Sequence, residues 1–168
     1  IIIVILLFEV IKMSKVGKSV QICVSWQPCQ GGSIPPTALP VGGGVYICRA
    51  MIDGEMTPGK LAEGHTAAYI PFAGEEKSVD CCEVLCDTGL HAFGDEYAWE
   101  ACSGGAVPKR ALLAGHTADN SPLYIGRTQI NDDWVAGKVA PHHGCAYFPY
   151  GGEEHQRTEY EVLCFTKN

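Results

Sequence analysis

Two pairs of adjacent carboxylates, Glu75-Glu76 and Glu153-Glu154, are the residues of this chain that come closest to an acid–base pair. Glycoside hydrolysis needs two carboxyl groups that flank the same bond of one substrate. Adjacent side chains in a strand point to opposite faces, so neither pair can act on one substrate in this way. Each pair directly follows a glycine, which is typical of a turn. No nucleophile with a matching base stands out elsewhere, and we therefore predict a protein that is not an enzyme.

Cofactor and metal binding find little support in the residue pattern. The glycine run at 42–44 lacks the lysine of a phosphate-binding loop. Two groups of residues could bind a metal, and they are Cys81, Cys82 and Cys86, and His142, His143 and Cys145. The first group has no second C-x-x-C pair, and the second aligns in the other half of the chain with residues that cannot bind the same metal. The nine cysteines are odd in number, and we interpret them mostly as reduced thiols. We predict no cofactor and no metal site.

Composition and charge narrow the range of partners. The net charge is -7, which argues against attraction to nucleic acid or to an anionic membrane, because those partners need clustered Lys and Arg. The apolar run from Ile1 to Phe8 suits one buried strand and is far shorter than the roughly 20 residues that span a bilayer. No basic start and no A-x-A cleavage site accompany it. We therefore expect no membrane span and no secretion by the usual route, and a neutral ligand fits the charge balance.

The chain contains two copies of one sequence pattern. A shift of 78 positions aligns most of each copy without a gap, and a shift of 73 aligns the part before it, so the second copy has a loop five residues longer at 116–122. Such repetition indicates a fold built from two equivalent units. The longer shift carries Tyr46 onto Tyr124, Arg49 onto Arg127, Lys60 onto Lys138, Tyr69 onto Tyr147, Glu76 onto Glu154 and Cys86 onto Cys164, and the shorter one carries Trp26 onto Trp99.

Short runs rich in strand-forming residues alternate with turn signals in both copies. The runs at 45–51 and 123–129 end at Asp53-Gly54 and Asn131-Asp132, which predicts hairpins. Glycine is also frequent, at 20 residues, and helical composition is missing. Since neither copy alone has much core, we predict an all-β fold of two tandem repeats of short antiparallel strands, packed around a pseudo-twofold axis as a sandwich or barrel-like unit.

The repeat boundaries predict the organisation of the chain. Residues 1–24 form an N-terminal segment, and those before Met13 are expected to be an incomplete or over-extended reading frame or a native extension. Repeat 1 is expected at 25–87 and repeat 2 at 98–168. The stretch 88–97, with several turn-forming residues, is the predicted linker.

Several short motifs in fixed order resemble the DM9 repeat family. The resemblance runs from Trp26 to Phe165, which is nearly the whole chain, and an ordered series of motifs is more specific than one short match. The motifs of the second copy are LYIGR at 123–127, AGKV at 136–139, YFPYGGEE at 147–154 and YEVL at 160–163, and the first copy matches them at 45–49, 54–60, 69–76 and 83–85.

This resemblance implies a lectin of the mannose type that acts in microbial recognition. It also implies that the lysine of the P-G-K motif and an acidic residue in the loop before the L-Y-I-G-R strand hold the sugar. The lysines correspond to Lys60 and Lys138. The place of the acid in the second copy is occupied by Thr117, with Asp119 nearby, whereas the first copy has only the glycine run 42–44.

The chemistry of such a site is reasonable on its own terms. Sugar hydroxyls both donate and accept, so an ammonium beside a carboxylate can satisfy neighbouring hydroxyls with charge-assisted hydrogen bonds. Without the resemblance, both lysines would be interpreted as solvated turn residues; with it, Lys138 becomes the predicted main donor, and both interpretations stay open for Lys60. Trp134 could stack on a sugar ring or belong to the core. The predicted sugar-binding residues are Lys138, with Asp119 or Asp133 as its acceptor, and Thr117, Lys60 and Glu55.

We therefore expect a carbohydrate-binding lectin that recognises mannose or mannose-containing glycans in innate immunity. The alternative is an intracellular stress-response or vesicle-associated scaffold that uses the same β surface for protein partners. A homodimer is expected, because linked weak sites gain avidity. The expected location is the cytoplasm, with non-classical export or surface association as an open alternative.

Overall fold

The computed structural model describes residues 24–89 and 97–166. The predicted strand at Ile1 to Phe8, the residues around Met13 and most of the predicted linker lie outside the described residues. Fourteen strands make up the described part, together with one short 3₁₀ turn, η2 (Pro141–His143). No helix in these two ranges has the length and apolar character needed to cross a bilayer. The predicted all-β fold is therefore confirmed.

Each copy contributes seven strands, and every pairing between them is antiparallel. The first copy holds β1 (Val24–Gln30), β2 (Pro40–Gly42), β3 (Val45–Ile52), β4 (Glu55–Ala62), β5 (Ala68–Phe72), β6 (Glu75–Val79) and β7 (Cys81–Asp87). The second copy holds β8 (Tyr97–Ser103), β9 (Leu113–His116), β10 (Pro122–Ile130), β11 (Asp133–Ala140), β12 (Cys145–Tyr150), β13 (Glu153–Arg157) and β14 (Glu159–Phe165).

The central hairpin of each copy follows from its turn residues. β3 and β4 are joined by Asp53-Gly54, and β10 and β11 by Asn131-Asp132, as the sequence predicted. All four turn residues have positive φ values, between 48° and 83°. A two-residue turn of this type matches the right-handed twist of the strands, and Gly, Asn and Asp tolerate its backbone conformation best.

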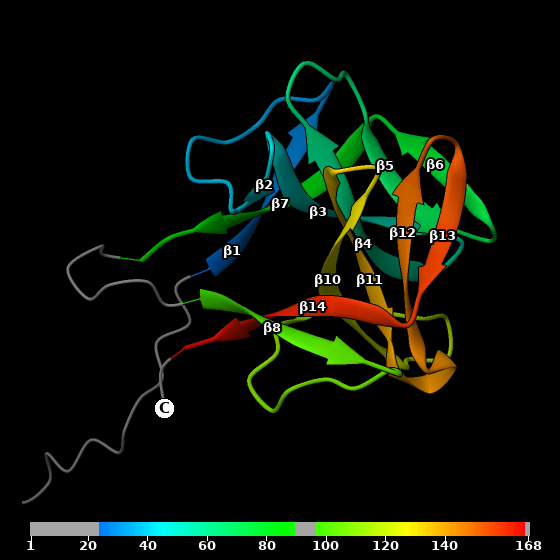
Figure 1. Cartoon of the computed structure of the whole chain (residues 1–168). Helices are drawn as coiled ribbons and strands as arrows, with labels where there is room; N and C mark the ends of the chain where they lie inside the picture. Colours follow the sequence, from blue (N-terminus) through cyan, green and yellow to red (C-terminus); the bar gives the residue numbers. More distant parts are fainter. Residues whose placement is uncertain (1–23, 90–96, 167–168) are drawn as a thin grey trace, which may run out of the picture.

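The strand order shows the pseudo-twofold arrangement. Hydrogen-bonded neighbours follow the order β1-β7-β3-β4-β5-β6-β13-β12-β11-β10-β14-β8, so each strand of one half has its equivalent at the mirrored position of the other half. The halves meet where Glu75 of β6 pairs with Glu153 of β13. Figure 1 shows β12 and β13 of the second copy beside β5 and β6 of the first. This arrangement confirms the predicted packing of two repeats around a pseudo-twofold axis.

A shared apolar cluster joins the two copies. Ile47 and Leu85 of the first copy pack in the same buried cluster as Ile125 and Leu163 of the second. Two further clusters lie within single copies, one centred on β4, β5 and β7 and the other on β11, β12 and β14. Because part of the buried apolar surface requires both copies, neither copy retains its whole core when the other is removed.

Two arginines tie the copies together at equivalent places. Arg49 forms an ion pair with Glu83 at 2.6 Å and donates to the carbonyl oxygen of Ala114 in the second copy at 2.9 Å. Arg127 forms an ion pair with Glu161 at 2.5 Å and donates to the carbonyl oxygen of Val41 in the first copy at 2.9 Å. Each arginine therefore fixes a strand of the other copy next to its own sheet. The guanidinium groups also lie over tryptophan rings, Arg49 over Trp26 and Arg127 over Trp99 and Trp134.

Candidate functional site: two pockets built by both copies

The two lysines of the repeated motif occupy equivalent, largely buried ion pairs. Lys60 Nζ lies 3.0 Å from the Glu76 carboxylate, and Lys138 Nζ lies 3.0 Å from the Glu154 carboxylate. The four side chains are between 8% and 13% exposed, so solvent screens these pairs much less than a surface pair. The interpretation of the lysines as solvated turn residues is therefore wrong for both copies. The sequence argument also missed Glu76 and Glu154 as their partners.

The glycine before each lysine has a steric cause. A Cβ atom added to Gly59 would lie 2.3 Å from the carbonyl oxygen of Tyr69, and one added to Gly137 would lie 2.1 Å from that of Tyr147. The strand that carries the lysine therefore runs too close to its neighbour for any side chain at this position. The Gly-Lys pair is thus a positioning device, in which the glycine permits the close strand contact that fixes where the lysine begins.

Each ion pair is held in place by the other copy. The second carboxylate oxygen of Glu76 accepts a hydrogen bond from the backbone amide of Gly152 at 2.7 Å. The equivalent oxygen of Glu154 accepts one from the amide of Gly74 at 2.8 Å. Lys138 additionally donates to the carbonyl oxygen of Pro71 in the first copy at 2.8 Å. The two lysine sites are therefore reciprocal, and both copies complete each of them.

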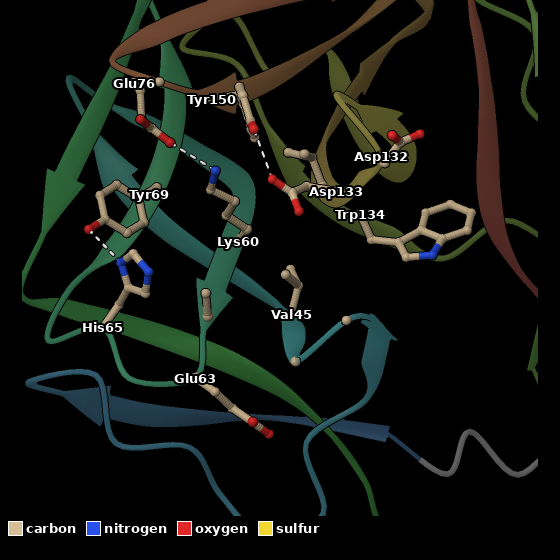
Figure 2. A pocket seen from close by; sticks show the side chains of 15 residues that line it. Val45, Lys60, Glu63, His65, Tyr69, Glu76, Asp132, Asp133, Trp134 and Tyr150 are labelled. Carbon is tan, nitrogen blue, oxygen red and sulfur yellow. Dashed lines mark hydrogen bonds and ion pairs between the residues drawn. The ribbon is translucent and has the colours of Figure 1, made fainter.

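A pocket of about 720 Å³ opens over Lys60. Tyr69 and Tyr150 flank the ammonium group, at 5.5 and 5.1 Å from Nζ to their ring centres, and Tyr150 belongs to the second copy. Tyr150 donates to Asp133 at 2.8 Å, and this hydrogen bond raises the pKa of the tyrosine. Figure 2 shows Lys60 and Asp133 facing the middle of this pocket, with Trp134 beyond them.

A smaller pocket of about 310 Å³ surrounds Lys138. Thr117 donates to Asp119 within it, and this bond, followed by bonds from Ser121, lowers the pKa of the Asp119 carboxyl. Glu55 of the first copy reaches the same pocket, where its carboxylate accepts from the amide of Ala118 at 3.4 Å. An ammonium donor, two carboxylate acceptors and a hydroxyl thus line one small cavity.

The predicted site residues fall into two groups. Lys138, Thr117, Asp119 and Glu55 line the smaller pocket together. Asp133, predicted as an alternative acceptor for Lys138, lines the Lys60 pocket instead. The cause is the exchange between copies, because Glu55 and Asp133 occupy equivalent positions, 78 residues apart, and each contributes to the pocket of the other copy's lysine.

Trp134 fits both interpretations, because it belongs to the pocket and to the core. This side chain lines the Lys60 pocket and also packs against the apolar cluster that both copies share. A Cβ atom on Gly42 would lie 2.5 Å from the indole ring, so the ring rests directly on the short glycine run of the first copy. Its equivalent in the first copy is Met56.

Comparison with known proteins agrees with this two-copy organisation. The family model described as DM9 repeat matches residues 7–79 and 42–157. Natterin-1 of Thalassophryne nattereri is 23% identical over 150 residues, which cover 85% of this chain and 38% of that protein. The crystal structure of the nematode sperm cell motility protein MFP2B superimposes with a TM-score of 0.65 at 16% identity, over 95% of this chain and 51% of that one.

The chain thus spans about half or less of these two relatives, and the likeness to MFP2B concerns the fold alone. The family match, in contrast, covers most of the sequence, in two overlapping regions. The chain belongs to the DM9 repeat family.

Proposed function

We propose that this protein is a carbohydrate-binding lectin of the mannose type that recognises glycans, including those of microbes, and catalyses no reaction. The observation that carries the proposal is the composition of the Lys138 pocket, where Lys138, Asp119, Glu55 and Thr117 surround one cavity of about 310 Å³. The family match supports a binding module of this kind.

The chemistry of the pocket suits a neutral sugar. Lys138 is a donor only, whereas the carboxylates of Asp119 and Glu55 are acceptors, and vicinal hydroxyl groups can use both kinds of partner at once. Asp119 keeps its negative charge over the whole neutral and mildly acidic range, because hydrogen bonds from Thr117 and Ser121 lower its pKa from 3.8. The site therefore offers fixed charges of both signs to a ligand that carries none.

The contacts of the carboxylates beside the lysines support a role in holding rather than in reacting. Glu76 and Glu154 each form an ion pair through one carboxylate oxygen and accept a backbone hydrogen bond through the other. These four contacts support a structural role for the two glutamates.

The test is titration of mannose by calorimetry, together with a glycan array. We expect mannose-inhibitable binding that Asp119→Asn and Glu55→Gln each weaken by about tenfold, the loss that removing one charged hydrogen bond produces. These substitutions spare the Lys138 and Glu154 ion pair, so they separate binding from folding. A blank array with a reproducible protein partner would contradict the lectin and favour the scaffold alternative.

Avidity supports a homodimer as a further part of this proposal. We also propose that the protein is cytoplasmic and reaches surfaces by non-classical export. Weak single sites gain strength when two or more engage one glycan surface. Sedimentation of the purified protein at micromolar concentration tests the dimer, and a monomer at all concentrations would contradict it.

A further inference from the structure

We propose that Cys29 and Cys82 form an oxidation site, at which a hydroperoxide converts their two thiols into one intrachain disulfide. The site belongs to the core of the first copy, and neither residue lines a lysine pocket. It is therefore independent of the proposed sugar binding. The disulfide would join β1 and β7, the first and last described strands of that copy.

The strand register places the two cysteines directly opposite each other. Cys29 of β1 pairs with Cys82 of β7 in an antiparallel ladder, and both side chains belong to one buried cluster. The Cα atoms of directly opposite residues lie about 4.5 to 5.5 Å apart, within the roughly 4.4 to 6.8 Å that a disulfide spans. In the strand ladders of residues 24–89 and 97–166, no other two cysteines stand opposite each other. The backbone thus already holds this pair at bridging distance.

A third thiol lies beside this pair. Cys48 of β3 stands opposite Val84, which is two residues from Cys82 in β7, so Cys48 occupies the diagonal position on the same face. Diagonal neighbours are about 7 to 8 Å apart, at or beyond the limit for a disulfide. Cys48 is also fully buried, whereas Cys29 and Cys82 are 9% and 8% exposed and lie nearer to solvent. Cys48 is therefore a neighbour of the bridge and not one of its ends.

The contacts within this group make Cys82 the first thiol to ionise. Hydrogen bonds, first from Cys48 and then from Cys29, lower the pKa of the Cys82 thiol against the opposing effect of burial. Burial raises the pKa of Cys29 to about 11 and also raises that of Cys48, so both thiols keep their protons. Since the thiolate is the nucleophile, Cys82 is the residue that attacks the oxidant, and Cys48 positions its charge.

The oxidation consumes one peroxide for each disulfide. The Cys82 thiolate attacks one peroxide oxygen, the O–O bond breaks, and Cys82 becomes a sulfenic acid while the other oxygen leaves and takes up a proton. The Cys29 sulfur then forms the S–S bond, and its thiol proton leaves with the sulfenic hydroxyl as water. With hydrogen peroxide, two thiols and one peroxide give one disulfide and two water molecules. Two electrons pass from sulfur to oxygen.

The second copy supplies a matched control. Cys102, the counterpart of Cys29, stands opposite Tyr160, which occupies the position of Cys82. The position of Cys48 is occupied by Gly126. Cys102 thus has the same place in the repeat without a thiol opposite it, so it should not enter an intrachain bridge of this kind.

Thiol counting and peptide mapping test the assignment on the whole chain. We expect a small excess of hydrogen peroxide to remove two of the nine thiols, and the peptides that carry Cys29 and Cys82 to be linked until dithiothreitol is added. Cys102→Ser should still lose two thiols and form the same link. Cys29→Ser should form no disulfide and should instead leave a sulfenic acid at Cys82, which dimedone labels.

Two further measurements test the parts of the site. Cys48→Ala removes the main donor to Cys82, so the midpoint of the oxidation rate against pH should move to higher pH, and Cys48→Ser, which retains a donor, should move it less. The disulfide restricts the unfolded chain, so the oxidised parent should unfold at a higher temperature than the reduced parent. Cys29→Ser should show no such rise after the same treatment.

Several results would overturn the proposal. These are nine free thiols after peroxide treatment, an intrachain disulfide that maps to another pair such as Cys29 and Cys48, or chains crosslinked through the exposed Cys81 while Cys29 and Cys82 stay reduced. A Cys48→Ala variant with the pH profile of the parent would remove Cys48 from the site, whereas the mapped Cys29–Cys82 disulfide would still support the oxidation site itself.

Discussion

The two pockets differ at their rims and agree at their bases. Both bases contain a Gly-Lys pair, an ion pair to glutamate and a carboxylate anchored on a turn of the other copy. The rims differ, with a glycine run and Trp134 at one pocket and the loop of Thr117 and Asp119 at the other. The repeated residues therefore build the common base of the pockets, whereas the residues that do not repeat determine the shape of each cavity.

The largest effect should come from removing a lysine at the base. Lys138→Ala leaves the Glu154 carboxylate, 8% exposed, without its cation, and breaking such a buried pair costs about 3–5 kcal/mol of unfolding free energy. Lys60→Ala should cost somewhat less, because Lys138 also donates to Pro71. Urea unfolding measures both. A loss below 1 kcal/mol in either variant would contradict this common base. The control is the double variant Lys138→Met and Glu154→Gln, which removes both charges.

A smaller and equal loss is expected at the two glycines. Gly59→Ala and Gly137→Ala place a methyl group within 2.3 and 2.1 Å of a backbone oxygen, so the neighbouring strand must move in both copies. Overpacking of this kind costs about 1–3 kcal/mol. Thermal unfolding of the two variants should give similar shifts. A large shift in only one of them would show that the bases are less alike than their geometry indicates.

The rim should respond more weakly. Trp134→Met gives the second copy the residue that the first copy has at Met56. The indole lies 4.2 Å from the Arg127 guanidinium, and the loss of one cation–π contact costs about 0.5–2 kcal/mol. We expect a small loss of the free energy of unfolding, measured by urea titration. An unchanged free energy of unfolding would show that Trp134 contributes no more to the rim than Met56 does in the first copy.

The smallest effect concerns protonation of the longer loop. Thr117→Val removes the main cause of the lowered pKa of Asp119, so that pKa should rise toward 3.8. Because the folded pKa is lowered, the stabilisation from this bond is present above the unfolded pKa and is lost as the pH falls through the folded value. Carboxyl-detected NMR titration measures the change. An Asp119 pKa that does not move would mean that Ser121 alone holds the carboxylate.

The sequence predicted the repeats and hairpins well because their signals are local. Asp53-Gly54 and Asn131-Asp132 determine turns through their own backbone preferences, and the alternation beside them determines strands. The contacts between copies have no such signal. Nothing near Asp133 in the sequence indicates that it faces Lys60 rather than Lys138, since this depends on how two halves pack after each has formed its strands.

The ion pairs do have a signal in the sequence. Glu76 and Glu154 repeat at the same shift as Lys60 and Lys138, and opposite charges that repeat together indicate a pair. The position of each Glu-Glu pair directly after a glycine is instead typical of a turn. The turn itself is at Ala73-Gly74 in the first copy, and the glutamates that follow it begin a strand and point one to each face, Glu75 outward and Glu76 toward Lys60.

The reciprocal anchoring of Glu76 on Gly152 and of Glu154 on Gly74 has a consequence for how such sites can diverge. A chain with a single repeat could build this frame only by pairing with an identical chain, and its two pockets would then carry the same residues by symmetry. When both repeats share one chain, a substitution enters one pocket alone. Covalent linkage thus removes the symmetry constraint, so one pocket can gain a longer loop and the other a tryptophan while the common frame is retained.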